Sequence, residues 1–130
     1  MRTEATKLWK QALNELSVAE ALINAGHYAA ASFHSQQAGE MALKAVFIQQ
    51  HGGLYTQHKL YELAKKLSTP TNVYRAASRL TPVYLETRYF DARPDGKVPS
   101  EEYTKDDATS YYNDAQEITQ WAHTQLTKKN

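Results

Sequence analysis

Glycine and proline are scarce in this 130-residue chain, and their positions divide it into segments long enough to form helices. The chain has only five glycines and four prolines. Both residue types disfavour helix interiors, glycine because of its backbone entropy and proline because it lacks an N–H group. The stretches between Gly26, Gly52-Gly53 and Pro70 contain many residues of high helix propensity. This distribution predicts an all-α protein.

Apolar residues recur at spacings of three and four in each of these segments. The links between the segments are short, which favours antiparallel neighbours. The chain has the length of one domain. We therefore predict an up-and-down antiparallel bundle of four to five helices in a single domain, 1–130. The expected helices cover about 3–25, 28–50, 57–67, 72–89 and 104–126.

Several residues predict how these helices begin and end. Thr56 is a plausible N-cap for the third helix. Pro82 should kink or restart the fourth helix, with Thr81 as the local cap. Residues 90–103 are typical of a loop, and Thr104 and Asp107 have the spacing of a capping box at the start of the last helix.

The bulk composition excludes several classes of site. No cysteine is present, so disulfides, thiolate metal sites and cysteine nucleophiles are excluded. The formal net charge is only +1, so contact with RNA would need a local basic patch. No stretch approaches the roughly 20 apolar residues that span a bilayer. We see no targeting signal at the N-terminus and expect a cytoplasmic protein without membrane contact.

The second predicted helix has apolar residues around much of its circumference, as a central helix would. Four polar residues lie among them: Gln36, Gln37, Glu40 and Lys44. They could form a polar pocket or a seam between two copies of the chain. Alternatively, they form a solvated face on which Glu40 and Lys44 make an ordinary surface pair at i and i+4.

A second candidate site lies at the end of the fourth helix and in the loop after it. Three cations fall within ten positions beside two aromatic rings, so they could hold a phosphate while a ring stacks on a base. Alternatively, Arg88 caps the helix C-terminus and pairs locally with Asp91 in a solvated loop. The candidate ligand-binding residues are Arg88, Tyr89, Asp91, Arg93 and Lys97.

We predict neither a metal ion nor a cofactor. His27 and His34 are seven residues apart, about 10 Å along a helix axis. Histidine pairs that share a metal on a helix usually lie at i and i+4. The five glycines form no phosphate-binding loop.

The run from His27 to Ala45 resembles the second-helix signature of HEPN domains: Tyr, small residues, Phe, Gln-Gln-Ala, Glu and then Leu-Lys-Ala. His58 is similar to the family's histidine at the start of the third helix. Tyr84, Arg88, Tyr89 and Asp91 resemble its aromatic-Arg-Tyr-Pro-Asp segment, although Phe90 stands in place of the proline. Tyr103, Thr104 and Asp107 fit the start of its last helix.

The resemblance implies a helical bundle that forms homodimers. Small prokaryotic family members are often encoded beside a minimal nucleotidyltransferase, and some pairs act as toxin and antitoxin. The family name reflects a proposed nucleotide-binding role, and several members are metal-independent ribonucleases. These enzymes use an arginine followed, after four to six residues, by a histidine.

This chain departs from the ribonuclease motif. The three positions at motif spacing from Arg88 hold Arg93, Pro94 and Asp95 rather than histidine. We therefore expect a non-catalytic HEPN module that binds a nucleotidyltransferase partner and a nucleotide or RNA. The alternative is a divergent ribonuclease toxin, in which Arg88 holds the phosphate and His58 moves the proton.

Overall fold

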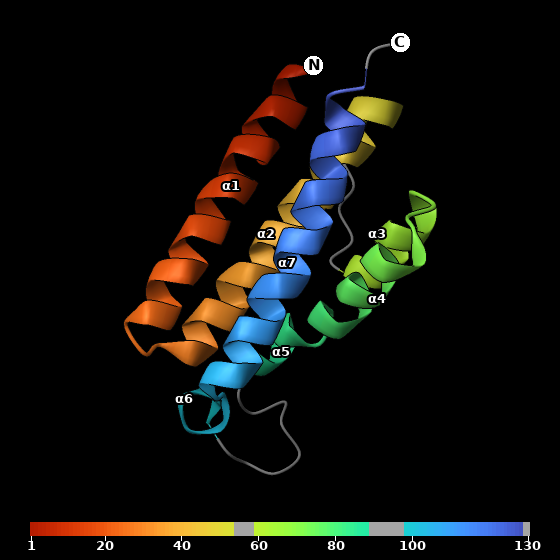
Figure 1. The fold of residues 1–130 in the computed structure, drawn as a ribbon. Coiled ribbons are helices and arrows are strands. Elements are labelled where there is room, and N and C mark those ends of the chain that lie inside the picture. The colour runs from red at the N-terminus through yellow and green to blue at the C-terminus, as the bar shows by residue number, and fades with distance from the viewer. Residues whose placement is uncertain (54–58, 89–97, 129–130) are drawn as a thin grey trace.

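The computed structural model describes residues 1–53, 59–88 and 98–128, and in these ranges it contains helices and no strands. The helices α1, α2, α3, α4 and α7 have at least seven residues, which confirms the predicted all-α bundle (Figure 1). None of the helices in the described ranges is long and apolar enough to cross a membrane. In chain order they are α1 (Thr3–Asn24), α2 (Tyr28–His51), α3 (Leu60–Lys66), α4 (Thr71–Leu80), α5 (Val83–Arg88), α6 (Pro99–Glu102) and α7 (Lys105–Leu126).

Helix α2 is the centre of the bundle. It contacts every other helix of the described chain, and α1 and α7 run alongside it over most of its length (Figure 1). Half of its residues are buried, among them Leu43 and Val46, which are fully buried in the core. The prediction of a central helix with neighbours on several sides is confirmed.

Three other helices approach α2 closely at Gly39. A Cβ atom at this position would lie 3.2 Å from a methyl carbon of Ile118 on α7 and 3.2 Å from one of Leu60 on α3. A methyl carbon of Leu80, on α4, would lie 3.4 Å away. The missing side chain therefore lets these helices pack closely against the middle of α2.

The fourth predicted helix is divided in two at Pro82, as expected for a restart. Helix α4 ends at Leu80 and α5 begins at Val83. The hydroxyl of Thr81 accepts a hydrogen bond from the backbone N–H of Tyr61 at 3.2 Å and donates one to the carbonyl of Ala77. Thr81 thus satisfies a free N–H in the first turn of α3, whereas we predicted that it caps the restarted helix.

Two other predicted boundaries are wrong. Helix α3 begins at Leu60 rather than 57, because Lys59 has an extended backbone; the predicted cap Thr56 lies outside the described residues. The predicted loop 90–103 contains a short helix, α6, which places Pro99 at its first position, where a missing N–H costs nothing.

The capping box at the start of α7 is confirmed. The Thr104 hydroxyl accepts a hydrogen bond from the backbone N–H of Asp107, and the Asp107 carboxylate accepts one from the N–H of Thr104. These two bonds satisfy free donors of the helix N-terminus and fix where α7 begins.

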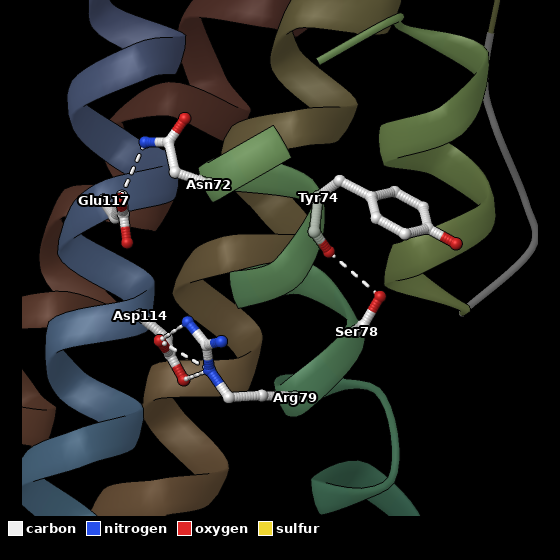
Figure 2. Close-up of polar contacts among 6 residues, drawn as sticks. All are labelled: Asn72, Tyr74, Ser78, Arg79, Asp114 and Glu117. Carbon is white, nitrogen blue, oxygen red and sulfur yellow. Dashed lines mark hydrogen bonds and ion pairs between the residues drawn. The ribbon is translucent and has the colours of Figure 1, made fainter. Parts of the chain in front are cut away.

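Polar side chains join α4 to α7 (Figure 2). The Arg79 guanidinium donates to both carboxylate oxygens of the buried Asp114, with its shortest contact at 2.7 Å. Its hydrogen bond to Asp114 raises the pKa of Arg79 above the usual value for arginine. Near this pair, the Asn72 amide donates to Glu117 at 2.7 Å. Because α5 follows α4 after a two-residue turn, these contacts also help to fix the position of α5.

Candidate functional site

Arg88 is the last residue of α5, and its side chain is exposed. The Cζ atom of its guanidinium lies 4.8 Å from the centroid of the Phe33 ring, on α2. A cation in this position is attracted to the face of the ring, which restricts the orientation of a long, flexible side chain. The ring therefore favours this position of the guanidinium, which remains open to solvent.

A cleft of about 600 Å³ adjoins Arg88. It lies at the end of the bundle where the α1–α2 turn, α5 and α6 come together (Figure 1). The first turn of α2 lies along the cleft, and free backbone N–H groups at a helix N-terminus favour anions. The volume is within the range of small-molecule sites. The lining residues are Gly26, His27, Tyr28, Ala29, Ala30, Phe33, Thr87, Arg88, Pro99 and Ser100.

The structure describes only part of the predicted ligand-binding set. Arg88 lines the cleft, as described above. Tyr89, Asp91, Arg93 and Lys97 lie outside the described residues, as does His58, the predicted proton-transfer group. The Arg88–Asp91 pair and the roles of these residues therefore remain predictions.

The four polar residues of α2 form one hydrogen-bonded chain. The Gln37 amide donates to the Gln36 side-chain oxygen at 2.6 Å, and the Gln36 amide donates to Glu40 at 3.3 Å. The Lys44 ammonium pairs with the other Glu40 oxygen at 3.1 Å. Gln36 is fully buried and Glu40 is 5% exposed, so these two are not part of a solvated face. Gln37 and Lys44 are half-buried and reach the surface.

The contact of Arg88 with Phe33 and the polar chain of α2 lie on the same side of this helix. Phe33, which contacts Arg88, precedes Gln37 by four residues, Glu40 by seven and Lys44 by eleven. These spacings place the residues on one face of a helix. Phe33, at the cleft, and the polar chain along the middle of α2 therefore lie on the same strip of the helix surface.

A contact between α1 and α2 was not foreseen from the sequence. The Nδ1 atom of His34 pairs with the carboxylate of Glu15. The histidine ring also meets the Phe33 ring edge to face, with the two centroids 5.2 Å apart. Glu15 and His34 are nineteen residues apart on different helices, so no spacing rule could have paired them. Phe33 belongs to the family signature, but nothing in its sequence environment indicated a contact with Arg88.

No metal site is evident in the described part of the chain. Its residues include no group of three histidine, aspartate or glutamate side chains placed to hold an ion. His27 is exposed and lines the cleft, whereas His34 pairs with Glu15.

Comparisons with known proteins agree with this architecture. The family model of the HEPN domain matches residues 5–126. A protein of Methanocaldococcus jannaschii called "Putative toxin MJ1304" is 31% identical over 127 residues, which cover 84% of this chain and 79% of that protein.

Solved structures show the same fold. The crystal structure of TT1696 from Thermus thermophilus has a TM-score of 0.88 at 29% identity and covers 96% of this chain and all of that one. ST0689, described as an archaeal HEPN homologue, has a TM-score of 0.82 at 30% identity and covers 98% of this chain and all of its own. A HEPN domain protein of Thermotoga maritima has a TM-score of 0.73 at 27% identity and covers 95% of this chain and 99% of its own. The family model and these structures, over almost the whole chain, show that the protein is a member of the HEPN domain family.

Proposed function

We propose that this protein is a homodimeric HEPN binding module, comparable to the HEPN half of a toxin–antitoxin pair, which binds the phosphate of a nucleotide or RNA in the Arg88 cleft. The single observation that carries the proposal is the Arg88 guanidinium, held over Phe33 beside a cleft of ligand size. Arginine binds phosphate through several N–H groups at once, and Phe33 offers a ring near the phosphate site. A minimal nucleotidyltransferase is the partner that the family suggests.

Replacing Arg88 with alanine should weaken the binding of a fluorescently labelled single-stranded oligoribonucleotide. A hydrogen bond to a charged group is worth about 1.5–3 kcal/mol, which corresponds to a loss of affinity of roughly ten-fold to one-hundred-fold. Fluorescence anisotropy at fixed salt concentration measures the change, and a titration with ATP repeats the test for a mononucleotide.

Arg75→Ala is the matched control, because Arg75 is an exposed arginine on α4 that does not line the cleft. It removes the same charge and should leave affinity within about two-fold of the wild type at moderate salt. Equal losses in both variants, or no binding by the wild type, would count against the cleft as a phosphate site.

The half-buried strip of α2 supports the homodimer. Gln37 and Lys44 reach the surface there beside Met41, a partly buried apolar side chain that packs against the core. A two-fold axis along this strip would place each Gln37 close to its copy. We expect the wild type to be a dimer in light scattering coupled to size exclusion, and Gln37→Lys to be a folded monomer because two like charges would oppose each other.

Leu13→Lys tests a different surface. Leu13 is 46% exposed on α1 and lies beside α7 in a shallow groove with Trp9 and His123. If Leu13→Lys is a monomer and Gln37→Lys is not, the dimer contact lies on the α1–α7 side rather than on α2. A monomeric wild type would refute the homodimer itself. A stable complex on co-expression with an adjacent small nucleotidyltransferase would support the partner.

A further inference from the structure

His27 is a second side chain of the Arg88 cleft that can carry a positive charge. It is exposed, it immediately precedes α2, and it lines the cleft together with Arg88 of α5. The described lining residues include no aspartate or glutamate, so no carboxylate in that set opposes an anion. A phosphate held by Arg88 therefore binds in a cleft whose described cationic groups are one guanidinium and one imidazole.

The His27 imidazole is free to contact a ligand. His27 is the N-cap residue of α2, yet its side chain makes no hydrogen bond to the helix. N-cap positions favour serine, threonine, aspartate and asparagine, whose oxygens accept from the N–H groups of the first turn. Within the described part of the chain, the His27 ring also makes no ion pair or ring contact. Stabilisation of the helix therefore does not account for this ring, and both of its nitrogens are open to a phosphate.

Protonation changes how strongly an imidazole binds phosphate. Histidine is the side chain that normally gains or loses a charge between pH 5 and 8. The neutral ring has one N–H donor, whereas the imidazolium has two donors and a positive charge. Hydrogen bonds from a charged donor are roughly twice as strong as those between neutral groups. The phosphodiesters of RNA keep one negative charge each over this range, so the charge that changes is on the protein.

We propose that His27 contacts the phosphate together with Arg88, and that its protonation makes RNA binding in the cleft stronger at acidic pH. The proposal rests on the proposed binding of a phosphate beside Arg88. An arginine keeps its charge throughout this pH range, so Arg88 supplies the constant part of the affinity. His27 supplies the part that changes, because a bound phosphate favours the protonated imidazole and binding therefore takes up a proton.

His34 is a second histidine near the cleft, but it is paired elsewhere. Its ring meets the ring of Phe33, which lines the cleft. Its Nδ1 atom pairs with the carboxylate of Glu15 on α1, and neither His34 nor Glu15 lines the cleft. Protonation of His34 therefore changes a contact between two helices rather than the charge of the cleft lining.

Among the described residues, the other ionisable groups around the cleft keep their charge over this pH range. Tyr28 lines the cleft from α2, and a phenol is normally neutral here. On α6, Ser100 lines the cleft, while Glu101 and Glu102 come next in the sequence and are not among the lining residues. Carboxylates are normally ionised over this range, so these two oppose an anion equally at both ends of it.

The test compares RNA affinity at about pH 5.5 and about pH 8 by fluorescence anisotropy at constant ionic strength. The probe is a labelled single-stranded oligoribonucleotide without terminal phosphates. We expect the wild type to bind roughly three-fold to ten-fold more tightly at the lower pH. His27→Gln has a polar side chain that does not titrate. Its affinity should be the same at both pH values and close to that of the wild type at the higher pH.

His27→Lys separates the charge from other effects of the ring. Lysine is protonated at both pH values, so this variant should bind at both about as tightly as the wild type does at the lower pH. Because His27 is exposed, we expect both substitutions to leave the protein folded. Circular dichroism and thermal melting check that they do.

His34→Gln and His123→Gln are the matched controls. Each removes one titrating ring outside the cleft lining, since His34 pairs with Glu15 and His123 stacks on Trp9. Both variants should keep the wild-type ratio of the affinities at the two pH values.

The outcomes distinguish this proposal from the proposed function. RNA binding that depends on Arg88 but is equally strong at the two pH values overturns the role of His27 and leaves the phosphate site intact. A pH dependence that persists in His27→Gln, or that disappears in His34→Gln, also overturns that role. Should the wild type bind ATP but not RNA, the same variants are compared with ATP at each pH, because the titration of ATP itself is common to all of them. Absence of binding to both ligands overturns both proposals.

Discussion

Replacing Leu43 with alanine is expected to lower the free energy of unfolding by about 2–5 kcal/mol. Leu43 is fully buried in the middle of α2, the helix that every other described helix contacts. The change removes side-chain carbon atoms from a close-packed core, and the neighbouring helices can fill the resulting cavity only in part. Urea unfolding followed by circular dichroism measures the effect as a lower midpoint with an unchanged slope.

Leu13→Ala provides the control, since it makes the same chemical change at a leucine that is 46% exposed. Its cost should be within about 0.5 kcal/mol of zero, as for most surface substitutions. Similar losses in the two variants would mean that the α2 core is not the main source of stability. A loss in Leu13→Ala that depends on protein concentration would instead indicate that Leu13 is covered in an oligomer.

The helical fold could be predicted because its determinants are local. Periodic apolar residues, the stops at Gly26 and Gly52, and the capping box of Thr104 and Asp107 each act within a few residues in sequence. The central position of α2 also followed from sequence, because apolar residues all around a helix need neighbours on several sides.

The errors occurred where contacts between distant segments decide the outcome. Thr81 was expected to cap the helix that follows it, but its hydroxyl bonds to Tyr61, twenty residues earlier. Sequence alone could not show whether the Thr81 hydroxyl would accept from the N–H of Tyr61 or from an N–H of the helix that follows it. Either donor needs only a hydroxyl close by. The errors at the start of α3 and at α6 have the same cause, because short helices depend more on tertiary packing than on helix propensity.

The candidate site was only partly accessible to sequence reasoning. Arg88 and the polar residues of α2 could be selected by residue type and by resemblance to a family. The contact of Arg88 with Phe33, and the Glu15–His34 pair, could be seen only once α1, α2 and α5 were packed together.

Replacing Glu40 with alanine is the second change with a large expected effect, a loss of about 3–5 kcal/mol in the free energy of unfolding. The variant leaves the buried Gln36 amide without the acceptor it uses, and it leaves the partly buried Lys44 ammonium without its carboxylate. Unpaired groups of this kind cost far more than the pair contributed when intact. The loss should be visible in urea unfolding as well as in the melting temperature.

The double variant Glu40→Ala/Lys44→Met tests whether the loss of the Glu40–Lys44 ion pair causes the decrease in the free energy of unfolding. It removes the unpaired ammonium while keeping an apolar chain of similar length, so it should recover part of the lost stability. Glu40→Gln should cost less than Glu40→Ala, because an amide oxygen can still accept from Gln36. If the double variant is no more stable than Glu40→Ala, Lys44 reaches solvent without penalty, and the cost lies in Gln36 and the packing of the Glu40 side chain. In that case Glu40 stabilises the protein from inside the bundle, through its hydrogen bond with Gln36 and its packing.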